Sequence, residues 1–196
     1  SKPMEQLSKG SGESTVLSAY SSSVINLGNS LTTSLGVTGQ YFTLNKNWSI
    51  EPRVALKWEM NPAHSLAVAY GLHSRRERLD YYFVEQVIND KKESNRYLDF
   101  SKAHHFGLTY DWNINQGLHL KIEPYYQYLF HIPVEENSSF SIINYEEFYL
   151  DRILINTGTA KNYGIDITLE QYMKNGFYYM ITGSLFKSKY LSLIHI

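Results

Sequence analysis

The sequence predicts an all-β chain: an antiparallel, up-and-down segment of a transmembrane β-barrel, with about eight long strands in four hairpins. Apolar and polar residues alternate with a period of two over long runs, which is the pattern of a strand with two different faces. Short turns join the paired runs at one end, and two long charged connections lie at the other. Tyrosine supplies 17 of the 196 residues, and tyrosine is enriched at membrane interfaces.

The first two hairpins are expected at 14–26 with 31–43 and at 49–60 with 65–76. The first is rich in Ser, Thr and Val and turns at Leu27-Gly28-Asn29-Ser30. The second turns at Asn61-Pro62-Ala63-His64, a tetrapeptide of turn-forming residues. One face of its first strand carries Ile50, Pro52, Val54, Leu56, Trp58 and Met60, and the other carries Glu51, Arg53, Lys57 and Glu59.

The last two hairpins are expected at 100–113 with 118–133 and at 160–173 with 177–190. Their turns are Asn115-Gln116-Gly117 and Lys174-Asn175-Gly176. Alternation is regular in all four segments, so a helix would scatter their apolar residues around its axis. The segment 118–133 shows the pattern over its whole length, with Leu118, Leu120, Ile122, Pro124, Tyr126, Tyr128, Phe130 and Ile132 on one face.

The expected strands are about twice as long as the ~5–6 residues usual in globular proteins. A tilted strand needs ~9–11 residues to cross the hydrocarbon core of a bilayer. Four aromatic residues fall within about three residues of the short turns, namely Trp58, Trp112, Tyr172 and Phe177. Aromatic rings at a fixed depth are typical of the membrane interface, so we expect these four to belong to an interfacial girdle.

Connection lengths also favour an outer-membrane barrel. The short turns all lie at one end, whereas the other end carries the long connections Arg75 to Asp99 and Val134 to Thr159. Bacterial outer-membrane barrels have short periplasmic turns and longer extracellular loops, so we expect the bacterial outer membrane as the location and its lipid as a partner. In this orientation, the first strand begins and the last ends on the extracellular side. We therefore expect an internal slice of a larger barrel, which does not form a stable closed barrel alone because its edges are unpaired.

Composition excludes several other classes. The formal net charge of -1 gives no basic footprint for nucleic acid. The absence of cysteine excludes disulfides and thiolate metal sites. The sequence contains no metalloprotease, nucleophile-elbow or phosphate-loop motif, so we expect neither an enzyme nor a bound cofactor. His104 and His105 are adjacent in a strand and point to opposite faces, so we expect no metal site there.

The long connections carry the candidate ligand-binding residues. Arg75, Arg76 and Arg78 have the chemistry to bind a carboxylate or a phosphate. Tyr145, Phe148 and Tyr149 offer rings on which a sugar or an aromatic chelate can stack. A solvated charged loop explains the arginines equally well from sequence alone. Asp166 and Glu170 share a strand face, and we interpret them as lumen lining rather than as an acid/base pair.

Several segments resemble one family. They include 103–111, 120–129, 132–134, 156–158, 162–165 and 178–190. As a set, these segments are similar to the barrel of Bacteroidetes TonB-dependent outer-membrane receptors, over most of residues 30–190. The resemblance implies a 22-stranded barrel that binds a nutrient (a siderophore, vitamin, glycan or peptide) at extracellular loops. It further implies import with TonB-supplied energy, through contact of the TonB complex with a plug region that this sequence does not include.

The chain is expected to divide into an irregular lead-in at 1–12, a partial barrel at 13–190 and a non-native tail at 191–196. The tail departs from the family pattern and resembles a translated adapter sequence. Two alternatives to a transport receptor stay open. One is a passive or structural outer-membrane barrel without energised transport, and the other is a soluble β-sandwich that binds carbohydrate. A plug domain encoded upstream discriminates the receptor from the passive barrel.

Overall fold

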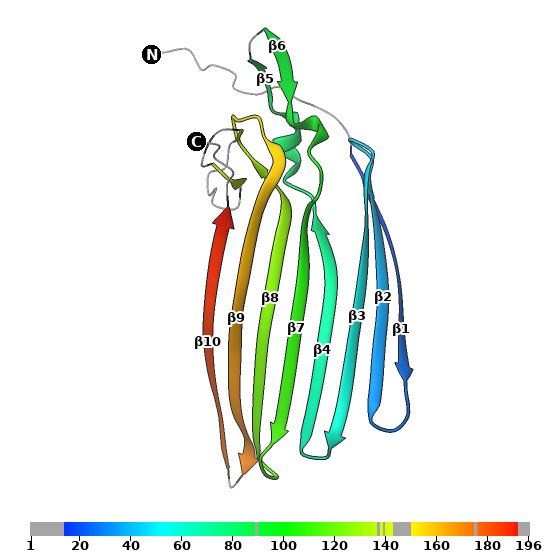
Figure 1. The fold of residues 1–196 in the computed structure, drawn as a ribbon, viewed down its shortest axis with the longest axis vertical. Coiled ribbons are helices and arrows are strands. Elements are labelled where there is room, and N and C mark those ends of the chain that lie inside the picture. The colour runs from blue at the N-terminus through cyan, green and yellow to red at the C-terminus, as the bar shows by residue number, and fades with distance from the viewer. Residues whose placement is uncertain are drawn as a thin grey trace.

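The computed structural model describes residues 14–88, 90–136, 138, 140–142, 150–174 and 176–191. Eight strands form one antiparallel sheet in the order β1-β2-β3-β4-β7-β8-β9-β10, and β5 pairs with β6 in a separate two-stranded sheet (Figure 1). The long strands are β1 Val16–Asn26, β2 Leu31–Phe42, β3 Asn47–Asn61, β4 His64–Arg75, β7 Ser101–Asn113, β8 Leu118–Val134, β9 Ile155–Lys174 and β10 Phe177–Leu191. Among the described residues, no helix has the length and hydropathy needed to cross a bilayer.

The all-β antiparallel fold and the four predicted hairpins are confirmed. Each of the eight long strands lies within a few residues of its predicted bounds, the largest difference being β9, which begins at Ile155 rather than at residue 160. Sequence patterning missed the structure inside the first long connection. There, two 3-10 turns, Leu79–Phe83 and Asn95–Tyr97, flank the hairpin of β5 (Glu85–Ile88) and β6 (Lys91–Ser94). Four residues are too few for a period-two pattern to stand out.

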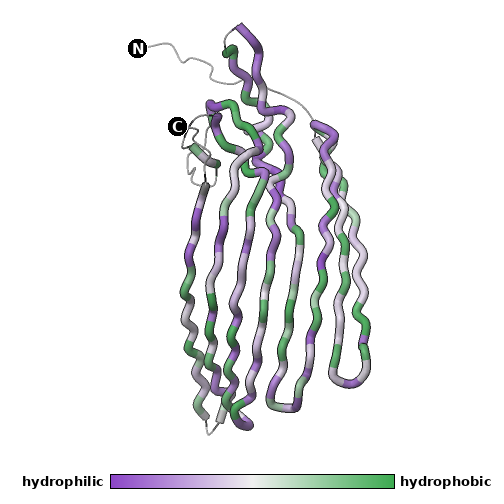
Figure 2. Tube along the Cα trace, in the orientation of Figure 1, coloured by the Kyte–Doolittle hydropathy of each residue, from purple (hydrophilic) through white to green (hydrophobic). Residues whose placement is uncertain are grey.

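The pairing register gives the sheet two chemically different faces. We call the face of Trp48, Val54 and Trp58 the apolar face, and the face of Glu51 and Arg53 the polar face. Following the register across the described strands, every Asp and Glu of the eight long strands lies on the polar face. These carboxylates are Glu51, Glu59, Asp111, Glu123, Asp166 and Glu170. Hydrophobic and hydrophilic positions accordingly follow one another along the strands (Figure 2).

The two outermost strands are less strictly divided. Tyr20 and Val24 of β1, and Met180 and Phe186 of β10, add large apolar side chains to the polar face. All four are more than half exposed. β1 and β10 are also the edges of the sheet, each paired on one side only among the described residues.

The hydrophobic core lies at the loop end and not within the sheet. Its buried members are Phe42, Tyr81, Tyr82, Val84, Leu98, Phe100, Leu150 and Leu154. Most of them belong to the long connections, which gather at one end of the strands (Figure 1). On β2 and β3, the polar-face residues Phe42, Ser49 and Glu51 are buried at this end. The connections therefore fold over the polar face, while apolar-face residues such as Phe106 stay 48% exposed.

One glycine allows a large polar-face side chain to lie flat on the sheet. Gly164 of β9 pairs with Tyr125 of β8. A Cβ atom at residue 164 would lie 2.6 Å from the backbone oxygen of Leu185 and 2.8 Å from the Tyr125 hydroxyl. The close approach explains why this position carries no side chain.

Candidate functional site

A recess of about 500 Å³ lies where the polar face meets the long connections. β4 contributes His73 and Arg75, β7 contributes Ser101 and His105, and the connection between these strands contributes Glu77. Ser74, Lys102 and Ala103 also line the recess, and the apolar residues Leu129, Ile132 and Ile142 complete the lining. A concave site with an apolar wall and a few convergent polar groups is the usual form of a small-ligand site.

Glu77 is the buried acidic group of this recess. Glu77 is 4% exposed. Its carboxylate accepts a hydrogen bond from the Ser101 hydroxyl at 2.6 Å, and its backbone N–H donates to the Tyr82 hydroxyl at 3.3 Å. Within the described part of the chain, Glu77 forms no ion pair. The recess is therefore lined by a buried carboxylate, that of Glu77, and by the exposed residue Arg75.

His73 and His105 continue the site down the polar face. Their ring centroids lie 4.6 Å apart. Both also line a second recess of about 500 Å³, to which Arg53, Tyr125 and Gln127 contribute polar atoms. The two recesses share the histidine pair, so polar groups extend from the loop end along the face of the sheet.

The structure separates the three predicted arginines. Arg75 lines the recess. Arg76 lies with its guanidinium carbon 6.0 Å from the centre of the Phe42 ring. Arg78 binds Asp80 through two hydrogen bonds of 3.0 and 3.2 Å and lies over the Tyr81 ring at 5.4 Å. Arg75 is thus the one of the three that lines the recess. The other predicted binding residues, Tyr145, Phe148 and Tyr149, lie outside the described residues.

Sequence reasoning missed His73, Glu77 and the pairing of His73 with His105. The cross-strand partner of His105 is Gly71, so His73 lies on the diagonal from His105. Only the register brings these two histidines together, because 32 positions separate them in the sequence. His104 lies on the opposite face, with its ring 5.0 Å from that of Phe130. In the described part of the chain, no group of three or more His, Cys, Asp or Glu is arranged to hold a metal ion.

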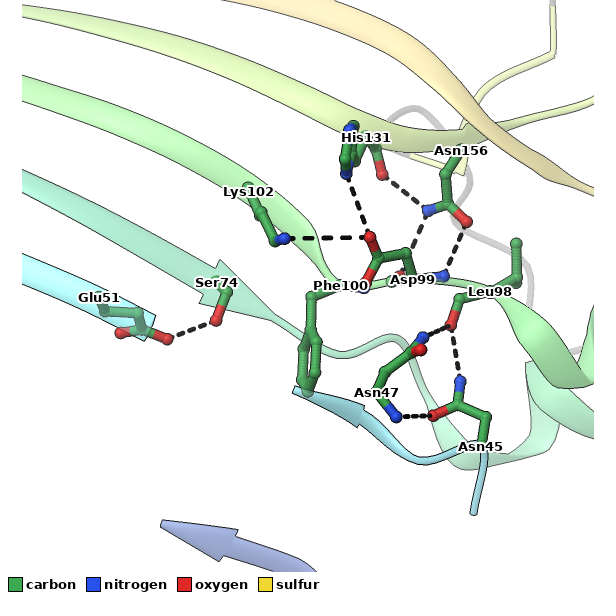
Figure 3. Close-up of polar contacts among 10 residues, drawn as sticks. All are labelled: Asn45, Asn47, Glu51, Ser74, Leu98, Asp99, Phe100, Lys102, His131 and Asn156. Atoms are coloured by element: carbon green, nitrogen blue, oxygen red, sulfur yellow. Dashed lines mark hydrogen bonds and ion pairs between the residues drawn. The ribbon is translucent and has the colours of Figure 1, made fainter. Parts of the chain in front are cut away.

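A polar network braces the connections against the strands (Figure 3). The Leu98 carbonyl accepts hydrogen bonds from the side-chain amides of Asn45 at 2.8 Å and Asn47 at 3.1 Å. The side chain of Asn156 accepts from the backbone N–H of Asp99 at 2.8 Å and donates to the carbonyl of His131 at 2.8 Å. These bonds tie the end of the first connection to β3 on one side and to β8 and β9 on the other.

His131 adds a charged contact to this network. Its backbone φ is 55°, in the left-handed region, and the residue lies where the pairing of β8 with β9 shifts register. This bend directs its Nδ1 to the Asp99 carboxylate at 3.2 Å. Lys102 approaches the same carboxylate at 3.9 Å. The connection above the recess is therefore held by side chains of four strands, β3, β7, β8 and β9.

The four predicted girdle residues occupy different places. Trp58 and Trp112 lie on the apolar face near the tight turns. Tyr172 stacks on the polar-face residue His119, with ring centroids 6.3 Å apart. Phe177 begins β10 beside a tight turn and is 76% exposed.

Trp48 was not predicted as a girdle residue. It lies on the apolar face of β3, ten residues from Trp58. Ten residues of strand span about 33 Å, and a tilt of about 40° reduces this to about 25 Å along the membrane normal. That height matches the apolar band of an outer-membrane barrel. The shared parity of Trp48 and Trp58 is the sequence signal that places both residues on this face.

A sheet of long antiparallel strands with an apolar face, tight turns at one end and folded connections at the other has the form of a strip of an antiparallel β-barrel. The chain is similar to the FrpB iron transporter from Neisseria meningitidis (F3-3 variant), with a TM-score of 0.65 and 14% sequence identity over 90% of this chain and 26% of that chain. It is similar to the F5-1 variant of that transporter, with a TM-score of 0.63 and 15% identity over 90% of this chain and 26% of that chain. It is also similar to a structure of the FpvAI–pyocin S2 complex, with a TM-score of 0.63 and 14% identity over 91% of this chain and 24% of that chain.

The chain spans about a quarter of the length of these structures. The TM-scores of 0.63–0.65 establish the likeness of the fold, and at identities of 14–15% they show the fold alone. No family model matches the chain, and no curated protein matches it in sequence.

Proposed function

We propose that this chain is part of a Bacteroidetes-type outer-membrane receptor, which binds a nutrient at its extracellular end and imports it with energy supplied through TonB. The observation that supports this most directly is the recess at the loop end of the polar face. It combines Arg75, the pair His73 and His105, and the buried carboxylate of Glu77. The proposal assigns binding and transport to the chain and no catalysis.

The polar groups continue from the loop end down the polar face, and this continuous path supports transport rather than a passive surface. The histidine pair lines both the recess under the connections and the recess further down the polar face. A ligand released from the first site therefore meets Arg53, Tyr125 and Gln127 next. In a closed barrel, this face lines the lumen, because the carboxylates of the strands are on it and the apolar face contacts lipid.

The charges of the recess define the first ligand to test. Arg75 provides bidentate donors that suit a carboxylate, and the neighbouring imidazoles add donors or acceptors according to their protonation. A metal chelate with carboxylate groups has this chemistry, and one of the structurally similar proteins is an iron transporter. We therefore choose ferric citrate as the first probe.

The test measures uptake of radiolabelled ferric citrate by cells that express the natural full-length polypeptide. Uptake is expected to require TonB. In Arg75→Ala, the affinity for ferric citrate is expected to fall at least about tenfold, because a hydrogen bond to a charged group is lost. Arg96→Ala is the matched control, because Arg96 is an exposed arginine of the same connection that does not line the recess. Unchanged uptake after deletion of TonB would contradict energised transport and favour a passive barrel. Equal affinity in Arg75→Ala and the unaltered protein would contradict the assignment of the recess.

A further inference from the structure

The apolar face carries positive charge without negative charge. All six carboxylates of the described long strands lie on the polar face. By contrast, Lys161 of β9 and Lys187 and Lys189 of β10 lie on the apolar face, toward the loop end of their strands. All three side chains are exposed. An apolar lipid-facing surface has no need of three lysines for its own stability, since charge there is costly.

The register places two of these lysines directly opposite each other. Lys161 pairs with Lys189, and Lys187 lies on the diagonal, opposite Tyr163. Directly opposed side chains have Cβ atoms about 4.5–5.5 Å apart, and like charges in that arrangement destabilise the pair. No ion pair involving the three lysines is found in the described part of the chain. An external anion would relieve this repulsion.

Aromatic rings lie directly beside the lysines. The Lys161 ammonium group is 5.9 Å from the centre of the Tyr128 ring. Tyr128 pairs with Lys161, and Tyr126 pairs with Tyr163 one step further down the face. Amphipathic rings and lysines that extend toward water are both typical of the boundary between the hydrocarbon core and the headgroups.

The depth of the lysines agrees with that boundary. Lys189 and Tyr179 lie on the same face of β10, ten residues apart. This is the separation of Trp48 and Trp58 on β3, and it corresponds to about 25 Å along the membrane normal. Lys189 thus lies at the loop-side edge of the apolar band when Tyr179 lies at the other edge.

We propose that Lys161, Lys187 and Lys189 form a binding site for the phosphate group of a lipid headgroup in the leaflet on the loop side. The acyl chains of this lipid pack against the apolar face below, near Ile165 and Leu185. Lysine provides three donors to phosphate oxygens, and charge complementarity with a surface free of carboxylates selects an anionic headgroup. The inference depends on the membrane placement contained in the proposed function, and not on transport or on the ligand.

The test uses the natural full-length polypeptide, purified in dodecyl maltoside and titrated with dioleoyl phosphatidic acid. Binding is measured by native mass spectrometry. Lys161→Gln with Lys189→Gln is expected to weaken binding about 25-fold, roughly fivefold for each lysine. The matched control is Lys57→Gln with Lys121→Gln, two strand lysines of the polar face that pair with Glu59 and Glu123. This control is expected to bind as the unaltered protein does.

Dioleoyl phosphatidylcholine provides a separate test of whether the apolar face contacts lipid. It shares the acyl chains, so it is expected to bind weakly and equally to all variants, and millimolar inorganic phosphate is not expected to displace phosphatidic acid. Unchanged phosphatidic acid binding in the Lys161/Lys189 variant would overturn the proposal, as would an equal loss in the polar-face control or full displacement by inorganic phosphate. Failure of phosphatidylcholine to bind any form would overturn the membrane placement itself, whereas loss of iron uptake would leave the lipid result intact.

Discussion

Removal of the Phe42 ring is expected to release the loop-end core without dissolving the sheet. Phe42 is the last residue of β2 and is 1% exposed. Its ring lies 5.2 Å from that of Tyr82 in an edge-on arrangement and 6.5 Å from that of Phe100. Both partners belong to the first long connection or its end, so Phe42 is the strand residue on which this connection packs.

The size of the effect follows from the burial of the ring. Replacement of a buried Phe by Ala costs about 3–5 kcal/mol, which includes the cavity left behind. The near-complete burial of Phe42 and its two ring contacts place Phe42→Ala near the middle of this range, at about 4 kcal/mol. Since about 1.4 kcal/mol is a factor of ten, the open form of the connection becomes about 1000-fold more populated.

Limited tryptic digestion of the detergent-solubilised protein measures this opening. Cleavage follows the population of the open form when opening and closing are fast, so cleavage after Arg76 and Arg78 is expected to accelerate by about three orders of magnitude. Tyr41→Ala is the matched control, because Tyr41 is the preceding residue of β2, on the opposite face, and is 39% exposed. Acceleration of less than about tenfold in Phe42→Ala, or equal acceleration in Tyr41→Ala, would refute the role assigned to Phe42.

Three further predictions concern the same structure. Burial raises the pKa of Tyr82 to about 12, so its contribution to the stability of the loop-end core is complete below about pH 10, the ordinary tyrosine pKa, and is lost as the pH rises toward 12. The difference in absorbance at alkaline pH between the unaltered protein and Tyr82→Phe measures this titration. A midpoint near pH 10 would contradict the prediction. Gly164→Ala is expected to lower the free energy of unfolding by about 1–3 kcal/mol because the new Cβ atom clashes with the Leu185 carbonyl. Gly183→Ala has open space at its Cβ position and is expected to change this free energy by less than about 0.5 kcal/mol. Urea titration followed by heat-modifiable gel migration compares the two variants, and equal midpoints would argue against the close approach. Asn156→Ala removes a partner from the backbone of Asp99 and His131 at a cost of about 1–3 kcal/mol, and tryptic cleavage after Lys102 reports the loosening; an unchanged rate would show that the network does not hold the connection.

The candidate site was predictable from sequence only in part. The sequence predicts an anion-binding role for Arg75 because a basic residue at the start of a long connection has the chemistry to bind an anion, and Arg75 lines the recess. Arg78 has the same chemistry in sequence, but Asp80 neutralises it through two hydrogen bonds. The conformation of the folded connection determines which arginine is available to a ligand. Arg78 turns back to Asp80, two residues further along the chain, whereas Arg75 lines the recess.

The histidines show the same division between local and long-range information. Opposite directions for His104 and His105 follow from strand geometry alone, and the register confirms them. The proximity of His73 to His105 does not follow, because a shift of register by one residue would move one of them to the other face. The place of Tyr172 beside His119 also depends on the register and was not predicted.

The sequence by itself determined the strands, the tight turns and the two faces of the sheet. These depend on the alternation of side chains along an extended backbone and on turn-forming residues, which are properties of neighbouring residues. The tertiary structure alone decided the burial of Phe42 and Glu77, the histidine pair and the opposition of Lys161 to Lys189. Each of these joins residues far apart in the chain, and it exists only once the register is set and the connections have packed over one face.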